Sequence, residues 1–337
     1  MNAFEFHPVG LPLVSLGAAL ICAALIVLLR PVLHRYALAR PNARSSHKMP
    51  TPQGAGIAVI AATLSVSGTY AGLVGSTVPV ALFAATIFIA LVGFTDDIRP
   101  IRVLPRLLLQ AAAVGVVIWL APSDLRLLPW LPLSIEQIVL LVAGLWFVNL
   151  VNFMDGLDLM TAAEVVPITG ASVLLWIFGG YPVPPTIVAA ALGGAMLGFV
   201  PFNRPLAKVF LGDVGSLPIG LLLGWMLLQV ASTGHFVAAL LLPLYYLADA
   251  TLTLLRRVAT GDRFWMAHRS HYYQRATDNG FTALNVVGHV FVVNIALAAM
   301  ALASVSVSST RLRLLFLLAG ALSVALVLYR FSSARKP

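Results

Sequence analysis

The sequence predicts an all-α integral membrane protein, a polytopic helix bundle of about 10–11 transmembrane helices whose polar residues gather at one face. Of its 337 residues, 60% are hydrophobic and only 10% are charged. Soluble domains have roughly 45–50% apolar and about 25% charged residues. A run of about 20 apolar residues can cross a bilayer, and this chain contains many. Because Cys22 is the only cysteine, an intrachain disulfide and a cysteine-based metal cluster are both excluded.

Apolar runs between polar breaks predict eleven spans, and no linker or internal repeat divides them. We therefore interpret residues 1–337 as a single integral membrane domain. The spans are expected near residues 11–33, 55–75, 79–95, 104–121, 133–151, 161–178, 185–202, 214–232, 236–255, 284–306 and 312–330.

The lysines and arginines orient this bundle. One side holds 18 of the 21, in the loops near residues 30–48, 99–106, 204–208, 256–275 and 330–336. The other side holds Arg126, Arg311 and Arg313. The positive-inside rule makes the basic side cytoplasmic, with the N-terminus outside and the C-terminus inside. The net charge of +9 thus indicates topology and attraction to membrane lipid, not a nucleic-acid partner.

The acidic residues share the cytoplasmic side, although carboxylates are costly at membrane depth. Glu5, Asp124 and Glu136 are expected at the outer face, and Asp249 falls inside the ninth span. The other eight fall in or at the edge of cytoplasmic loops: Asp96, Asp97, Asp155, Asp158, Glu164, Asp213, Asp262 and Asp278. This convergence predicts an active site at the cytoplasmic surface.

Asp96 and Asp97 end the third span. Neighbouring positions on a helix point about 100° apart, so one carboxylate can face the bundle and the other a loop or metal. Paired carboxylates repel unless a cation neutralises them. The alternative is a solvated helix end with Arg99 as partner.

Asn149, Asn152, Asp155 and Asp158 follow one another at three-residue spacing. If this segment is helical, all four line one stripe. Such a stripe in apolar sequence indicates a bound polar group, and a satisfied structural network is the alternative.

Asp213 lies between Gly212 and Gly215, directly before the long apolar span expected at residues 214–232. Glycines allow a tight backbone, and a helix N-terminus offers free N–H groups to a phosphate. Asp213 is then expected to hold Mg²⁺, which typically uses one or two carboxylates plus substrate phosphates. The alternative is an aspartate that caps its own helix.

The loop 256–283 is the longest and most polar on the cytoplasmic side, and we expect it to form an arm between two spans. It contains His268, Arg269 and His271. Histidines three residues apart can share a helical face and bind metal, but no HExxH pattern accompanies them. A cation cluster that binds phosphate is favoured, and an arm without chemistry is the alternative. Together these residues predict Mg²⁺-dependent phosphotransfer with a lipid substrate.

At these motifs the chain resembles the polyprenyl-phosphate N-acetylhexosamine-1-phosphate transferases of glycosyltransferase family 4. The likeness is greatest to the branch that primes O-antigen with sugars such as N-acetylfucosamine. Five motifs occur in family order: residues 41–47 with 50–56, the Asp96-Asp97 pair, Asn149 to Asp158, Phe210 to Ser216, and His268 to His271.

The resemblance implies that a UDP-N-acetylhexosamine donates its sugar 1-phosphate to undecaprenyl phosphate in the bacterial inner membrane and releases UMP. It implies Mg²⁺ as cofactor, with Mn²⁺ as an alternative, and leaves a homodimer open. Asp213 resembles the main metal ligand, and Asp97 is assigned beside it. The catalytic residues carried over are Asp96, Asp97, Asp213, His268 and His271.

The substrate contacts that the resemblance implies are Lys48, Asn149, Asn152, Asp155, Asp158, Asn203, Phe210, Gly212, Ser216 and Arg269. Among them, Asn203 and Phe210 match positions that hold uracil in the family. Asp249, followed by Arg256 and Arg257, fits a family pattern without an assigned role.

The chain departs from the family pattern at several positions. The usual Asp-Gly-x-Asp-Gly ends here in Leu159, so a tight backbone position carries a leucine beside Asp158. Two other interpretations stay open: a transporter of an anionic lipid or sugar, and a catalytically degenerate family member. A CDP-alcohol phosphotransferase is disfavoured because its Asp-Gly-x-x-Ala-Arg motif is absent after Asp155.

Overall fold

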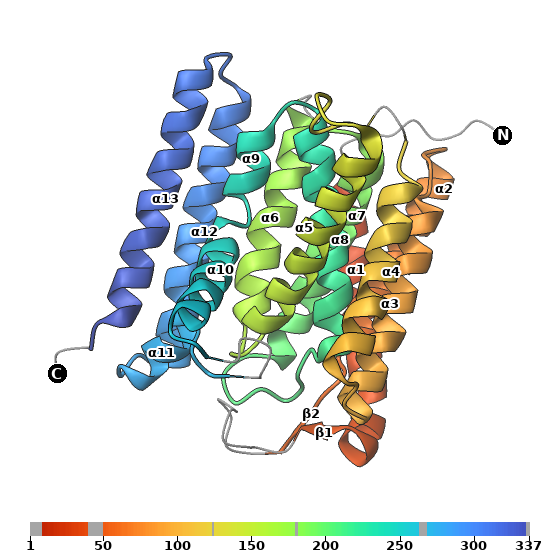
Figure 1. The fold of residues 1–337 in the computed structure, drawn as a ribbon. Coiled ribbons are helices and arrows are strands. Elements are labelled where there is room, and N and C mark those ends of the chain that lie inside the picture. Colours follow the sequence, from red (N-terminus) through yellow and green to blue (C-terminus); the bar gives the residue numbers. More distant parts are fainter. Residues whose placement is uncertain (1–8, 40–49, 123–124, 179–180, 263–267, 335–337) are drawn as a thin grey trace.

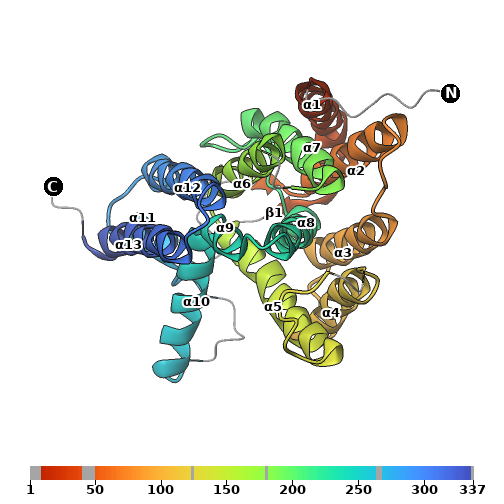
Figure 2. The same cartoon turned by 90° about the horizontal axis from the view of Figure 1, so that it is seen from above.

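The computed structural model describes residues 9–39, 50–122, 125–178, 181–262 and 268–334. These residues form the predicted all-α bundle, with most helices running along a common direction (Figure 1). Seen from above, the helices surround a packed centre occupied by α8 (Figure 2).

Over the described residues, nine helices are long and apolar enough to cross a membrane. They are α1 (Gly10–Tyr36), α2 (Gly56–Leu73), α3 (Val80–Ile98), α5 (Leu133–Met154), α6 (Met160–Ile177), α7 (Val183–Phe199, extended by the 3₁₀ turn Val200–Phe202), α8 (Asp213–Ser232), α12 (Ala283–Val305) and α13 (Thr310–Ser332). The shorter apolar α4 (Val103–Trp119) packs between α3 and α5. Nine of the eleven predicted spans thus coincide with helices long and apolar enough to cross a membrane, and α4 is a shorter apolar helix at the predicted span 104–121.

The ninth predicted span, 236–255, is wrong as a single helix. The chain forms α9 (Phe236–Leu241), turns at Leu242 and Pro243, and continues as α10 (Leu244–Ala259). Proline has no N–H for the helix ladder, and its ring collides with the preceding turn. As a result α10 leaves the bundle and projects from its side (Figure 2). The arm then continues into α11 (Tyr272–Asp278).

The start of α8 is held by close contact with two other helices. A Cβ added at Gly56 of α2 would lie 2.2 Å from the Cα of Gly215. A Cβ at Gly93 of α3 would lie 2.3 Å from the carbonyl oxygen of Asp213. Glycine at these positions lets three helix backbones touch, so the first turn of α8 has a fixed place between α2 and α3.

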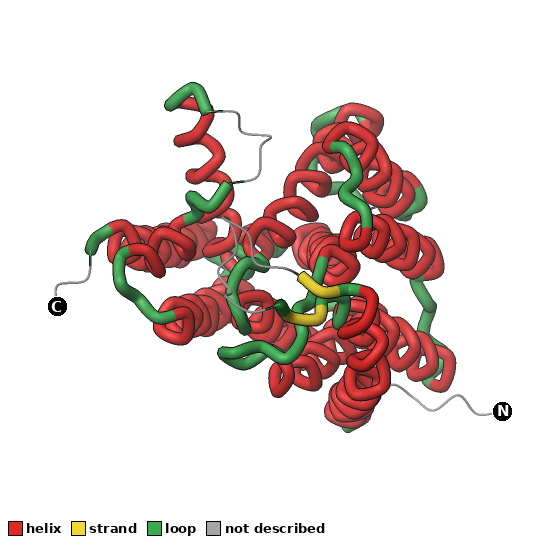
Figure 3. The backbone as a smooth tube through the Cα atoms, turned by 90° about the horizontal axis from the view of Figure 1, so that it is seen from below, coloured by secondary structure: helices red, strands yellow, loops and turns green. Residues whose placement is uncertain are grey.

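A small antiparallel pair of strands, β1 (Leu38–Ala39) and β2 (Thr51–Pro52), lies at the same end of the bundle (Figure 3). Directly after β2, Gln53 forms a parallel bridge with Phe210. The Phe210 carbonyl oxygen accepts hydrogen bonds from the N–H groups of Gly54 and Ala55 at 3.1 and 3.0 Å. The segment before α2 is thereby joined to the segment before α8.

Leu159, the residue before α6, has a backbone φ of 66° and ψ of −2°. This is the left-handed region, where a leucine is strained by contact between its Cβ and the following carbonyl. The leucine at the family's glycine position thus keeps a glycine-like backbone.

The ends of the bundle differ in charge as predicted. Helix α1 begins and helix α13 ends at opposite ends of the bundle (Figure 1). The end where α1 finishes carries Arg35, Arg99, Arg102 and Arg106. The assignment of this end to the cytoplasm stays a prediction from the positive-inside rule.

A reporter fused after the C-terminus tests that orientation. We expect a fluorescent protein placed there to fluoresce and an alkaline phosphatase to be inactive, because the basic end stays in the cytoplasm. The matched control carries the same reporters in the α12–α13 loop at Val307, where the pattern should invert. Phosphatase activity at the C-terminal fusion would overturn the orientation.

Strain at Leu159 is tested by comparing Leu159→Gly with Leu159→Ala. Both variants lose the side chain, but only alanine keeps the Cβ, so we expect glycine to be more stable by about 1 kcal/mol. The measurement is the unfolding temperature in one detergent. At Leu314 in the regular helix α13 the order should reverse, with glycine less stable by roughly 0.5–1 kcal/mol. The same order at both positions would contradict the assignment of strain.

Candidate active site

Asp213 is the first residue of α8 and lies where α8 meets the end of α5. Its Oδ1 accepts a hydrogen bond from Asn152 Nδ2 at 2.8 Å. The same Asn152 nitrogen donates to Ser216 Oγ at 2.8 Å. The structure thus brings together three residues that the sequence placed in two separate motifs.

Asp97 caps α8. Its Oδ1 accepts from the backbone N–H of Asp213 at 2.9 Å, and its Oδ2 accepts from that of Val214 at 3.1 Å. Gln53 Nε2 donates to Oδ1 as well. The first N–H groups of a helix have no partner within the helix and carry a partial positive charge, which a carboxylate satisfies. The alternative that Asp213 caps its own helix is therefore wrong, because Asp97 fills that role from α3.

Gly212, directly before Asp213, is required by this cap. Its φ is 77°, and a Cβ there would lie 2.6 Å from Asp97 Oδ2. The backbone N–H groups that were expected to bind a phosphate here thus bind the Asp97 carboxylate. The roles of Asp97 as a second metal ligand and of Gly212 as a substrate contact stay predictions.

Asp96 points away from its neighbour. Its Oδ1 accepts from the N–H of Ile101 at 2.6 Å, and its Oδ2 lies 2.8 Å from Nη1 of Arg106. The cationic partner is thus Arg106, in the first turn of α4, and the alternative of a solvated helix end with Arg99 as partner is wrong. The sequence contains a signal for Arg106, because it is basic and lies in the first turn of the helix after the acid pair, although membrane topology also accounts for an arginine there.

The predicted helical stripe of Asn149, Asn152, Asp155 and Asp158 is wrong. Helix α5 ends at Met154, so both aspartates lie in the loop before α6. The two asparagines also face different helices, because Asn149 Nδ2 donates to Gln110 Oε1 of α4 at 2.7 Å. The three-residue spacing of polar residues continues in the sequence beyond the end of α5, where the backbone is no longer helical.

Asp155 and Asp158 are held by separate partners in that loop. Asp155 accepts a hydrogen bond from Thr161 Oγ1. Asp158 Oδ2 accepts from the N–H of Ala207 at 3.3 Å. Burial, with smaller contributions from the charges of Asp97 and Asp158, raises the pKa of Asp155 to about 7, while the Thr161 hydrogen bond opposes the shift. The charge of Asp97, the residue that caps α8, therefore acts on Asp155.

Asn203 joins this loop to the segment before α8. Its Oδ1 accepts from the N–H of Leu159 at 2.7 Å, and its Nδ2 donates to the Val209 carbonyl at 3.0 Å. The amide thus holds backbone at both ends, and the uracil contacts assigned to Asn203 and Phe210 stay predictions. Lys48 lies outside the described residues.

The arm is anchored by Asp249, whose carboxylate is fully buried. It accepts from the N–H groups of Tyr272 and Tyr273 at 2.9 and 3.0 Å and from Tyr245 Oη at 3.1 Å. His271 Nδ1 lies 3.4 Å away. Asp249, which had no role from sequence, therefore holds the start of α11 and the histidine before it.

Tyr273 docks the arm onto the Asp155–Asp158 loop. Its Oη donates to the Phe153 carbonyl at 2.9 Å. A Cβ at Gly156 would lie 2.1 Å from that Oη, so the loop accepts the tyrosine only with a glycine there. The arm residue His271 consequently lies beside Phe153, with 6.3 Å between ring centroids.

In the structure, His268, Arg269 and His271 do not form the expected cluster of three cations. The two histidines precede α11, so they share no helical face, but their rings stack at 5.0 Å. Burial, with smaller contributions from His271, Arg257 and Arg256, lowers the pKa of His268 to about 4, so this imidazole is neutral at pH 7. The Arg269 guanidinium pairs with Asp278 and donates to Thr277 Oγ1. A substrate contact at any of the three stays a prediction.

Glu164 was expected at the edge of a cytoplasmic loop, but it lies inside α6 and is buried. Its Oε2 accepts from Asn294 Nδ2 of α12 at 2.6 Å. Like Asp249, Glu164 is therefore a buried acid inside a helix.

Asp96, Asp97 and Asp213, here called the acid cluster, offer oxygen ligands to a metal. Within the described ranges, no three His, Cys, Asp or Glu side chains are grouped to hold an ion by themselves. This donor set fits Mg²⁺, which typically binds one or two carboxylates and completes its shell with water and substrate phosphates. It does not fit a metal caged wholly by protein.

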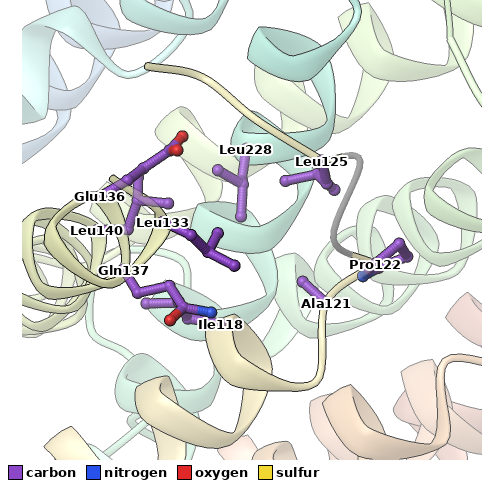
Figure 4. A pocket seen from close by; sticks show the side chains of 9 residues that line it. All are labelled: Ile118, Ala121, Pro122, Leu125, Leu133, Glu136, Gln137, Leu140 and Leu228. Atoms are coloured by element: carbon purple, nitrogen blue, oxygen red, sulfur yellow. The ribbon is translucent and has the colours of Figure 1, made fainter. Parts of the chain in front are cut away.

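An apolar pocket lies at the opposite end of the bundle, between α4, α5 and α8 (Figure 4). Its acidic member, Glu136, accepts from the N–H groups of Leu127 and Leu128 at 2.6 and 2.9 Å and pairs with Arg126. These bonds hold the α4–α5 loop, so we interpret the carboxylate as structural.

The chain is similar to known proteins over the residues that form this site. The model of glycosyl transferase family 4 matches residues 79–231, which contain Asp96, Asp97, the Asp155–Asp158 loop and Asp213. The decaprenyl-phosphate N-acetylglucosaminephosphotransferase of Mycolicibacterium smegmatis is 31% identical over 79% of this chain and 77% of its own. The phospho-N-acetylmuramoyl-pentapeptide-transferase of a Synechococcus species is 30% identical over 87% of this chain and 90% of its own. The chain therefore belongs to glycosyl transferase family 4, with the polyprenyl-phosphate hexosamine-1-phosphate transferases that its motifs resemble.

Proposed function

We propose that this protein transfers an N-acetylhexosamine 1-phosphate from a UDP-sugar to undecaprenyl phosphate. The products are the undecaprenyl-diphosphate sugar and UMP. The reaction would prime O-antigen or another cell-envelope polysaccharide at the cytoplasmic face of a bacterial inner membrane. The family and the relatives support the reaction class, and the motif resemblance supports the finer choice of lipid, donor and pathway.

The observation that carries the proposal is the position of Asp213. Its backbone is fixed by the Asp97 cap, its Oδ1 by Asn152, and its Oδ2 lies 3.6 Å from Arg106. A carboxylate held in this way at the membrane surface can bind a cation without moving. The preorganisation of such a group is what electrostatic catalysis of phosphoryl transfer requires.

In the proposed reaction, an oxygen of the lipid phosphate attacks the β-phosphorus of the UDP-sugar. The bond that forms joins that oxygen to the phosphorus, and the bond that breaks releases the bridging oxygen with UMP. Mg²⁺, or Mn²⁺, would supply positive charge against the diphosphate when bound to Asp213. A phosphate already ionised at neutral pH needs little help from a base, so Asp96 and Asp97 act mainly by holding Arg106 and α8.

Release of UMP by the purified protein tests the reaction. We expect release that requires undecaprenyl phosphate and Mg²⁺ together, with a panel of UDP-N-acetylhexosamines to name the preferred donor. Chelation of the metal should stop release, and added Mg²⁺ should restore it, because the donor diphosphate needs a counter-charge. Folded protein that releases no UMP with any donor would favour the transporter or the degenerate enzyme.

Substitution of Asp213 tests the site. We expect Asp213→Asn to lower UMP release by more than about 100-fold, since even groups behind a metal ligand contribute 10–100-fold. Its unfolding temperature without metal should not fall. The matched control is Asp262→Asn, which removes a carboxylate that is 54% exposed on the same side of the bundle. Near-normal release by Asp213→Asn would contradict the metal assignment.

A further inference from the structure

Arg106 lies where three helix ends meet. From the first turn of α4, its guanidinium reaches the last turn of α3 and the first turn of α8. Nη1 is 2.8 Å from Asp96 Oδ2 and 3.6 Å from Asp213 Oδ2. The side chain is only 21% exposed, and its buried Nε has no hydrogen-bond acceptor within the described parts of the chain.

The two contacts are unequal. At 2.8 Å the contact with Asp96 is a charge-assisted hydrogen bond, and the Ile101 N–H holds the same carboxylate. At 3.6 Å the contact with Asp213 is too long for a hydrogen bond and is an ion pair only. Arg106 can therefore lose Asp213 and keep its better partner.

The acid cluster needs this guanidinium when no metal is bound. The charge of Asp97 is met by two N–H groups of α8 and by Gln53. Among the described residues, the ion pairs of Asp96 and Asp213 with a basic side chain both go to Arg106. One positive charge is thus shared by two carboxylates on neighbouring helices.

A divalent cation on Asp213 would change that balance. It would bind the carboxylate at about 2.0–2.1 Å, and at that distance it would repel a guanidinium on the same group. Since Arg106 already donates to Asp96, a small movement toward Asp96 relieves the repulsion without leaving the guanidinium unpaired.

We propose that Arg106 is a built-in counter-ion that holds the Asp213 carboxylate in the metal-free protein and gives it up to a divalent cation. This inference rests on the proposed function, in which Asp213 is the metal ligand. Arg106 is then a positioning residue: it keeps the ligand in place between turnovers and sets how tightly the cation binds.

The test is the Mg²⁺ dependence of unfolding temperature for the full-length protein in detergent, without lipid or UDP-sugar. We expect Arg106→Met to unfold at a lower temperature in EDTA. It should also reach half of its Mg²⁺-induced rise at about tenfold lower Mg²⁺, because the competing charge is gone. Arg106→Lys keeps the charge and should stay close to wild type. Arg102→Met, an exposed arginine four residues earlier, is the control and should leave the titration unchanged.

A purely structural role would lower the unfolding temperature of Arg106→Met at every Mg²⁺ concentration and leave the half-saturation point where it was. That result, or weaker binding, would overturn the proposal. Arg106→Gln, which keeps a donor for Asp96, serves in the same titration if methionine prevents folding. Asp213→Asn separates the two proposals: if Mg²⁺ stabilises it as well as wild type, the metal assignment fails. A response lost in Asp213→Asn but not tightened in Arg106→Met rejects the counter-ion alone.

Discussion

The cap that Asp97 forms on α8 is the interaction on which the rest of the site depends. Helix α8 is the central helix and is mostly buried, and its first N–H groups, which have no acceptor within the helix, lie at the end that carries the site. Leaving such groups without acceptors in a buried setting costs several kcal/mol, on the order of 1–3 for each. One carboxylate from α3 satisfies two of them. Because the same bonds fix the backbone of Asp213, stability and preorganisation come from one contact.

That contact requires backbones to come closer than side chains permit. Gly56, Gly93 and Gly212 each stand where a Cβ would collide with α8 or with Asp97 itself. From the sequence, a tight backbone is expected at Gly212, and no such expectation attaches to Gly56 or Gly93. These glycines allow helices to approach α8 closely from both sides, and this use could not be predicted without knowing that α2, α3 and α8 are neighbours. The close approach explains why a motif near residue 54 and one near residue 213 lie side by side.

The helices were predictable because a bilayer demands long apolar runs, and the same cost made buried acids conspicuous. What failed were inferences about local geometry. Hydropathy alone did not resolve the break at Pro243, and spacing alone made Asp155 and Asp158 look helical. Arg106 was missed because its partner Asp96 is on another helix, and a basic residue at a membrane edge already had an explanation. Side-chain pairing across helices is a tertiary property that one sequence does not display.

The neutral imidazole of His268 limits what the arm can offer to a bound phosphate. Its neighbours Arg256 and Arg257 already place positive charge beside it, so a third cation would be unfavourable. Ser270 Oγ lies 2.9 Å from His268 Nδ1, and a hydroxyl that donates to Nδ1 leaves the ring proton on Nε2. An imidazole in that tautomer offers one N–H donor, directed away from the serine. In the proposed reaction the arm would therefore contribute charge through Arg256 and Arg257 and a hydrogen-bond donor through His268.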